Sequence, residues 1–189
     1  NCSVILEASK RFALGFFLFA LPYHFKSNKC MDFSKRPLQF DAVVKTPFGA
    51  VGISISGERI ATELLFGEYE STSIDNPLVK QTAHDLAHYF TDANHQIKLP
   101  LAKGTPFQER VWNAISTIPA GQVRTYQHIA IQIDSGARAV ANACGANHHP
   151  IIVPCHRVVA KSGLGGFMCG NPNGKKIKTW LLQYEGVTI

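Results

Sequence analysis

The spacing of apolar residues changes once along this chain, and this change constrains the fold more than any other feature. From Phe40 to Phe66 the pattern is that of short strands, and Val51, Ile53 and Ile55 alternate with glycine or serine. That alternation is typical of a half-buried strand. From Thr105 onwards apolar residues recur every three or four positions, as on one face of a helix. We therefore expect an α/β (α+β) protein, with an N-terminal sheet followed by a mostly helical part.

The change of pattern falls at Leu99–Gly104, and we place a domain boundary there. Residues 31–103 are expected to form an α/β domain with a short antiparallel sheet, a polar loop at Gly67–Asn76 and a helix that begins at Pro77. Residues 104–189 are expected to form a mostly helical domain. With 46% apolar and 17% charged residues in 189, the chain has the composition of a globular protein with a real core.

The first thirty residues are set apart because the sequence opens with Asn1 and its first methionine is Met31. The apolar stretch Phe12–Leu21 follows two basic residues and loosely resembles a secretory signal, but it is too short to span a bilayer and lacks a small-residue cleavage site. We interpret residues 1–30 as a mis-assigned leader, or else a disordered extension. They are expected to be dispensable, and we assign them no targeting role or membrane partner.

Positive charge is concentrated in the C-terminal part. Between Gly104 and Ile189 there are eight Lys or Arg residues and three Asp or Glu residues, so five of the chain's six net charges lie there. Such a basic half is expected where a protein meets a polyanion, because cationic side chains displace the counterions condensed on phosphates. Plain surface solubility explains the charge equally well.

Cysteine and histidine usage indicates a reducing, cytoplasmic setting without a metal site. The number of cysteines is odd and no C-x-x-C pair occurs, which argues against a disulfide framework or a zinc finger. His84 and His88 share a helix face, but no third ligand is in view, so we interpret them as surface residues. The cysteines are Cys2, Cys30, Cys144, Cys155 and Cys169.

Two short helices separated by a glycine-containing turn are predicted between Thr125 and Cys144. Thr125 is placed to cap the first helix, the break falls at Asp134-Ser135-Gly136, and the second helix begins at Ala137. This is the pattern of a helix-turn-helix, although any helical hairpin looks much the same. Arg138 stands among very small residues in the second helix, so the helix can approach another surface closely and project one long side chain into it.

Two further helices are predicted, one before and one after the segment that contains Cys155. A capping box at Thr105–Gln108 predicts a helix that stops at Pro119-Ala120-Gly121, and a final helix is predicted at Lys175–Tyr184, with Glu185 just beyond it. Between these helices, Ile151–Val153 is a β-type run.

Cys155 is the strongest candidate nucleophile. A cysteine reacts as its thiolate, so a reactive one needs a nearby base or positive charge to lower the thiol pKa. His156 and Arg157 follow Cys155 directly. For a single Cys-His pair taken alone, a buried inert cysteine is the more common case.

The run Ile151–Val159, with its core Pro154-Cys155-His156-Arg157-Val158, resembles the active-site signature of the O6-alkylguanine-DNA alkyltransferases, or methylated-DNA-protein-cysteine methyltransferases. Other residues of the family pattern are also present, namely Arg138-Ala139-Val140, Asn147 and Gly165-Gly166-Phe167. The similarity runs from about Thr105 to Gly186, and more faintly back to Phe40.

The resemblance implies a DNA repair protein that flips O6-alkylguanine out of duplex DNA and moves the alkyl group irreversibly onto Cys155; O4-alkylthymine is a further candidate substrate. His156 would deprotonate Cys155 through a bound water, and Glu185 would orient the histidine. Tyr126 would donate a hydrogen bond to the lesion base, and Asn147 would tie the recognition helix to the active-site turn.

The resemblance also implies how DNA and the lesion are held. Arg138 would be inserted into the base stack where the flipped nucleotide leaves, with the helix in the minor groove. We expect Ala137, Ala139, Asn142 and Arg157 to contact DNA as well. The expected pocket residues are Val158, Phe167 and Met168.

Two features depart from the family pattern: the turn between Tyr126 and Arg138 is about two residues short, and Asn171-Pro172-Asn173 is inserted after the pocket loop. The zinc ligands that some relatives carry in the N-terminal domain are not recognisable here. We therefore predict no metal and no cofactor, a monomer, and double-stranded DNA containing O6-alkylguanine as the partner.

Three other functions fit parts of the sequence. A helix-turn-helix regulator, whose cysteine merely packs or senses redox state, would need neither Tyr126 nor Glu185. A relative that recognises lesions without repairing them would lack the acceptor cysteine, and Cys155 is present. A cysteine peptidase is remote, because no oxyanion hole or peptide cleft is recognisable.

Overall fold

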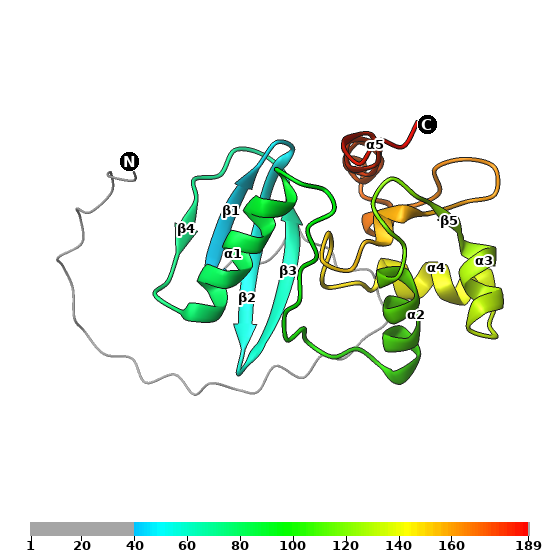
Figure 1. Cartoon of the computed structure of the whole chain (residues 1–189), viewed down its shortest axis with the longest axis horizontal. Coiled ribbons are helices and arrows are strands. Elements are labelled where there is room, and N and C mark those ends of the chain that lie inside the picture. Colours follow the sequence, from blue (N-terminus) through cyan, green and yellow to red (C-terminus); the bar gives the residue numbers. More distant parts are fainter. Residues whose placement is uncertain (1–39, 189) are drawn as a thin grey trace.

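A computed structural model describes residues 40–188 of the chain, and its N-terminal half is a small antiparallel sheet with one helix (Figure 1). The interpretation of residues 1–30 lies outside the described residues. The strands run in the order β3-β2-β1-β4, so each of the first three lies beside its neighbour in sequence. They are β1 (Ala42–Thr46), β2 (Gly49–Ser56), β3 (Arg59–Leu65) and β4 (Thr72–Ser73). The sequence prediction of a mixed α/β fold is confirmed.

Strand β4 was expected to be part of a polar loop. Its two residues are exposed and pair with β1 through Ala42↔Ser73 and Val43↔Thr72. A two-residue edge strand held by backbone pairing buries no side chain, so it leaves no alternating pattern in the sequence.

Helix α1 (Pro77–Tyr89) begins where the sequence predicted and lies across one face of the sheet (Figure 1). The Asn76 side chain accepts hydrogen bonds from the first free backbone N–H groups, those of Leu78 (2.8 Å) and Val79 (3.3 Å), and Pro77 lacks an N–H to satisfy. Val79, Thr82, Leu86 and Tyr89 are buried as its inner face, and Leu78 is half-buried.

The C-terminal half is mostly helical. Helix α2 (Pro106–Ser116) begins with the predicted capping box, in which the Thr105 backbone N–H donates to Gln108 Oε1 (2.8 Å) and the Gln108 backbone N–H donates to Thr105 Oγ1 (3.3 Å). It ends three residues before Pro119. The other elements are β5 (Arg124–Thr125), α3 (Tyr126–Gln132), α4 (Ala137–Gly145), β6 (Val158–Val159), which pairs with β5 in parallel, and α5 (Gly174–Tyr184).

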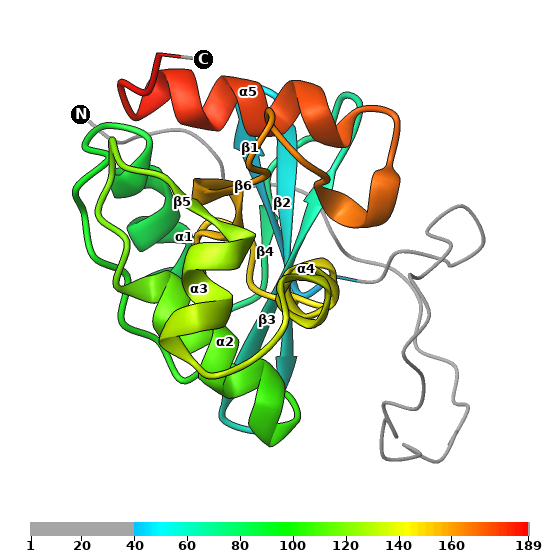
Figure 2. The same ribbon diagram turned by 90° about the vertical axis from the view of Figure 1, so that its right-hand side faces the viewer.

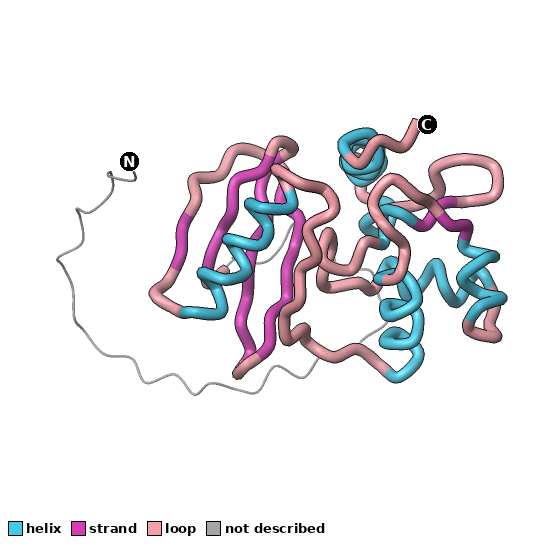
Figure 3. The backbone as a smooth tube through the Cα atoms, in the orientation of Figure 1, coloured by secondary structure: helices cyan, strands magenta, loops and turns pink. Residues whose placement is uncertain are grey.

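We call residues 40–103 the sheet unit and residues 104–188 the helical unit. Figure 3 shows the β1–β4 strands gathered at one end of the molecule and most helices at the other, and Figure 2 shows α5 running along one edge with α3 and α4 beside each other. The outer edge of β3 faces the helical unit, where Thr62 N donates to His148 O (2.8 Å). On the same edge, Ile60 N donates to Pro100 O (2.9 Å), in the segment that leads to the helical unit. One cluster of buried apolar side chains runs through both units.

Aromatic side chains also join the units. Trp180 on α5 packs edge-on against Phe48 of the β1–β2 turn, with ring centroids 5.4 Å apart, and stacks on Tyr184 at 5.3 Å. Tyr184 in turn meets the ring of Tyr89 at 5.7 Å. These contacts hold the end of α5 against the end of α1. Across residues 40–188, no helix is both long and apolar enough to cross a membrane.

Candidate active site

Cys155 lies at the start of a short 3-10 turn, Cys155–Arg157, which follows a strained loop. The prediction of a β-type run at Ile151–Val153 is wrong. These residues form a turn, closed by a hydrogen bond from Val153 N to His149 O (2.8 Å). Pro150 and Pro154 flank the run and cannot donate to a strand ladder. Ile151 has φ +75°, a costly conformation for a β-branched residue, so the surrounding packing must hold the loop in place.

The side-chain amide of Asn147 stabilises this loop through three hydrogen bonds. Its Nδ2 donates to Val153 O (2.9 Å) and to Cys155 Sγ (3.1 Å), and its Oδ1 accepts from His149 N (3.0 Å). Asn147 follows the end of α4, where its backbone N donates to Cys144 O (3.2 Å). The structure therefore places this amide between α4 and the Cys155 turn, in direct contact with the sulfur.

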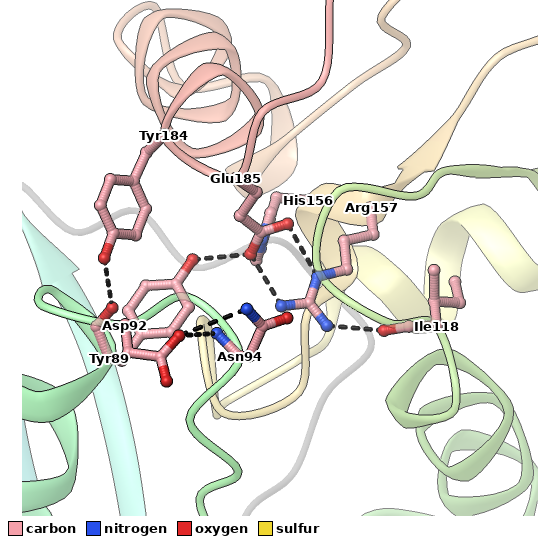
Figure 4. Close-up of polar contacts among 8 residues, drawn as sticks. All are labelled: Tyr89, Asp92, Asn94, Ile118, His156, Arg157, Tyr184 and Glu185. Atoms are coloured by element: carbon pink, nitrogen blue, oxygen red, sulfur yellow. Dashed lines mark hydrogen bonds and ion pairs between the residues drawn. The ribbon is translucent and has the colours of Figure 1, made fainter.

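The next two residues of the turn converge on Glu185, which follows the last residue of α5 (Figure 4). His156 Nε2 lies 2.9 Å from Glu185 Oε1. Arg157 donates to the same carboxylate twice, from Nε to Oε2 (2.9 Å) and from Nη2 to Oε1 (2.7 Å). Arg157 Nη1 also donates to Ile118 O (2.6 Å), which anchors the guanidinium to the segment after α2.

These contacts fix the tautomer of His156. Burial raises the pKa of Glu185, but hydrogen bonds from His156 and Arg157 outweigh it and lower the pKa to about 2, so the carboxylate is ionised and can only accept. Nε2 of His156 must therefore carry a proton. His156 is fully buried and its Nδ1 has no hydrogen-bond partner among the described residues. Since burial also lowers the pKa of His156, the resting imidazole is neutral, with its free lone pair on Nδ1.

The Cys155 thiol is only 6% exposed, and burial raises its pKa. The hydrogen bond from Asn147 and the positive charge of Lys178 act in the opposite direction. The site therefore rests as a neutral thiol and a neutral imidazole, with groups in place that stabilise a thiolate when the proton leaves.

Tyr126 and the loop after β6 form the neighbouring wall of the site. The Tyr126 hydroxyl donates to Gly166 O (3.2 Å), and its pKa is raised by burial and by the thiols of Cys144 and Cys155. Gly165 has φ +73°, and a Cβ there would lie 3.0 Å from the Tyr126 ring, so both the backbone conformation and the available space favour glycine. The other expected pocket residues lie here too: Val158 and Phe167 are buried and Met168 is half-buried.

Sequence reasoning missed Lys178, which is fully buried on α5. Its ammonium donates to Val158 O (2.6 Å) and Gly166 O (3.1 Å), and burial lowers its pKa to about 8. No carboxylate of residues 40–188 forms an ion pair with it. The signal was present in the sequence, because Lys178 stands beside Ile177 and three residues before Leu181, on the buried face of the helix.

The expected DNA-contacting residues divide into two groups. Arg138 and Asn142 are exposed on α4, and Ala137 and Ala139 are half-buried beside them. Arg157 does not lie on this surface: it is 9% exposed, and its guanidinium is bonded to Glu185 and Ile118. The interpretation of Arg157 as a DNA contact is corrected accordingly, because a buried carboxylate needs the charge of this guanidinium.

His84 and His88 are exposed on α1. Their rings lie 4.4 Å apart, centroid to centroid, and His95 lies 5.2 Å from His88, but its Nε2 is 2.9 Å from Asp85 Oδ1. In the part of the chain that the structure describes, no group of three His, Cys, Asp or Glu side chains is arranged to hold a metal ion.

Comparison with known proteins assigns the family. The family profile described as "6-O-methylguanine DNA methyltransferase, DNA binding domain" matches residues 106–187. The constitutive methylated-DNA-protein-cysteine methyltransferase of Bacillus subtilis (strain 168) is 34% identical over 164 residues, which cover 80% of this chain and 98% of that protein. The chain belongs to the methylated-DNA-protein-cysteine methyltransferase family.

Solved structures agree with this assignment. The crystal structure of Mycobacterium tuberculosis O6-methylguanine methyltransferase superposes with a TM-score of 0.64 at 35% identity, over 76% of this chain and 90% of that one. The structure of the M. tuberculosis protein in complex with DNA gives a TM-score of 0.62 at 34% identity, over 76% of this chain and 91% of that one.

Proposed function

We propose that this protein repairs DNA by moving an alkyl group from O6 of guanine to Sγ of Cys155. The thiol proton passes to His156 Nδ1 through a bound water, and the S–C bond forms as the C–O6 bond breaks. The guanine takes the electron pair of that bond, regains a proton from solvent, and stays in the DNA as the unalkylated base. The observation that carries the proposal is the Cys155–His156–Glu185 arrangement. Glu185 keeps the proton on His156 Nε2, so Nδ1 is the basic nitrogen of the residue that directly follows the nucleophile.

Other residues of the site support charge movement in this reaction. Tyr126, whose hydroxyl donates to Gly166 O in the structure, would instead donate to the lesion base, which becomes more negative as its O6 loses the alkyl group. Asn147 stabilises the thiolate through its contact with Sγ. Val158, Phe167 and Met168 are proposed to line the pocket that receives the flipped base.

The DNA partner is proposed to meet α3 and α4, which lie where the sequence predicts a helix-turn-helix and which we propose act as one. Arg138 is exposed on α4 and is surrounded by Ala137, Ala139 and Asn142, so a minor groove can approach the helix backbone closely around one long side chain. The M. tuberculosis relative solved with DNA supports this partner. We propose that residues 104–189 form the DNA-binding and alkyl-transfer domain, in a cytoplasmic monomer that uses no cofactor.

The test is a stoichiometry experiment. Duplex DNA carrying methyl-labelled O6-methylguanine is incubated with increasing amounts of protein, and the label is located by peptide mass spectrometry. We expect one methyl group per molecule, on Cys155 and on neither Cys144 nor Cys169, because a thioether is stable and ends the reaction. Repeated turnover, or a label elsewhere, would contradict the mechanism. Binding of the lesion without transfer would instead favour a recognition protein.

A further inference from the structure

The sheet unit contributes one polar group to the site. Tyr89 is the last residue of α1, and its hydroxyl donates to Glu185 Oε1 at 2.7 Å (Figure 4). Both side chains are buried, and the Tyr89 side chain is 2% exposed. The two residues are 96 positions apart in the sequence, so the contact exists only because the two units pack together.

The oxygen that Tyr89 contacts is the one that orients the histidine. Glu185 Oε1 also lies 2.9 Å from His156 Nε2 and accepts from Arg157 Nη2 (2.7 Å). Three donors therefore share one carboxylate oxygen. A donor to the ionised carboxylate favours that form and reduces the electron density that the oxygen offers to its other partners. Tyr89 thereby limits how strongly Glu185 attracts the proton on His156.

Ring packing fixes the position of the Tyr89 side chain, whose ring meets the rings of Tyr184 and Phe90 edge-on at 5.7 and 5.2 Å. The Tyr184 hydroxyl donates to the Tyr89 backbone carbonyl (2.6 Å) and not to the Tyr89 side chain. Such a side chain has little rotational freedom to lose when it bonds to Glu185.

The charged and titratable groups around this contact come from three segments. Arg157 faces both Tyr89 and His156, and the ammonium of Lys178 on α5 faces His156. Tyr184 lies next to Tyr89, and Asp92 lies next to Tyr184. The Asp92 carboxylate accepts from Asn94 N (2.9 Å) and is not among the partners of Glu185 Oε1.

We infer that Tyr89 is a positioning residue for alkyl transfer: from the sheet unit it holds the Glu185 carboxylate and sets the basicity of His156. The inference rests on the proposed function, since it assigns His156 as the base. It also gives the sheet unit a part in the chemistry, although the nucleophile, the histidine and the carboxylate all belong to the helical unit.

The experiment compares Tyr89→Phe with Tyr184→Phe. Tyr89→Phe keeps the ring and removes only the hydrogen bond to Glu185. Tyr184→Phe removes a half-buried hydroxyl from the same interface, one that bonds to Tyr89 O and not to Glu185. The single-turnover rate constant for transfer from O6-methylguanine in duplex DNA is measured between pH 5 and 9, at a temperature where melting curves show all variants folded.

For Tyr89→Phe we expect a rate constant about tenfold lower near neutral pH, because a Glu185 without this donor holds His156 less firmly in the orientation for proton transfer, and one hydrogen bond to a charged group is worth about a factor of ten. The acid limb of the curve of rate constant against pH should also move to higher pH, by about half a unit. Without the hydrogen bond from Tyr89, Glu185 attracts the proton of His156 more strongly, so His156 is easier to protonate. Tyr184→Phe should keep the wild-type limb. An unmoved limb in Tyr89→Phe, or an equal movement in Tyr184→Phe, would overturn the inference.

A second readout needs no DNA. Alkylation of Cys155 by iodoacetamide, followed by peptide mass spectrometry over the same pH range, reports on the same base. The acid limb should move in Tyr89→Phe as it does for transfer, and an unmoved limb here would also refute a role through His156. Failure of the wild-type protein to take a methyl group from DNA would instead refute the proposed function, so the two failures are distinguishable.

Discussion

The two units of the molecule use their interiors differently. The interior of the sheet unit is mostly apolar, with Ala42, Val51, Ile53 and Ile60 fully buried, and its buried polar side chains are three threonines and Asp85. In the helical unit the most buried groups include an imidazole, a guanidinium, an ammonium and a carboxylate. Burying polar groups is costly unless each is paired, whereas burying apolar ones stabilises the fold directly. The sheet unit is therefore expected to contribute mainly stability, and the helical unit mainly chemistry.

The sharpest test of this division is Cys155→Ser. We expect it to abolish alkyl transfer, because the serine hydroxyl is a far weaker nucleophile, while the free energy of unfolding changes by less than about 1 kcal/mol and DNA binding is largely kept. Label transfer, urea unfolding and binding to duplex DNA measure the three quantities. Cys169→Ser, which alters an exposed thiol, serves as the control and should transfer normally. Residual transfer by the Cys155 variant would contradict the assignment of the chemistry to this thiol of the helical unit.

The converse test is Ile53→Ala in β2. The side chain is fully buried, so its truncation should lower the free energy of unfolding by about 3 kcal/mol, while the transfer rate constant of the folded protein stays at the wild-type value. Urea titrations and single-turnover assays would measure both effects. Glu58→Ala, at an exposed turn, is the control and should change stability by less than about 0.5 kcal/mol. A slower reaction in the Ile53 variant would mean that the sheet unit shapes the site as a whole.

The junction between the units predicts a pH effect on stability. His149 is fully buried, its Nε2 lies 2.9 Å from Ala102 O, and burial lowers its pKa from 6.5 to about 4. The unfolded chain therefore binds a proton at His149 before the folded protein does, and stability is lost as the pH falls from about 6.5 to about 4. His149→Gln should lose up to about 3 kcal/mol less than the wild type over this range in urea titrations. The exposed variant His128→Gln should follow the wild type, and identical curves for all three proteins would exclude this role.

The smallest expected effect concerns Arg138 on α4. Arg138→Ala should slow repair in duplex DNA about tenfold, because holding a flipped base out of the stack is worth roughly 1 to 2 kcal/mol to a single side chain, while dealkylation of free O6-alkylguanine should be nearly unchanged. The free base serves as the internal control, since it needs no flipping. Equal losses on both substrates would place Arg138 in the chemistry and not in DNA handling.

Much of this molecule follows from local sequence. The alternation of Val51, Ile53 and Ile55 predicted β2, the Thr105–Gln108 capping box predicted the start of α2, and Asn76-Pro77 predicted the start of α1. Each of these signals works over a few residues, because strand faces repeat every second residue and a helix terminus is satisfied by side chains within one turn. The Pro154–Val158 motif likewise placed the nucleophile and its histidine side by side.

Only the tertiary structure decided which polar groups meet in the interior. The chain gives no local signal that Tyr89 bonds to Glu185, that Arg157 turns inward to the same carboxylate, or that the ammonium of Lys178 points to the Val158 carbonyl. A basic residue after a Cys-His pair looks like a surface group, and the helical spacing that puts Lys178 on the buried face does not name its partners. Their partners are set by the requirement that buried charges and donors be hydrogen-bonded, and this requirement acts only after distant elements have packed together.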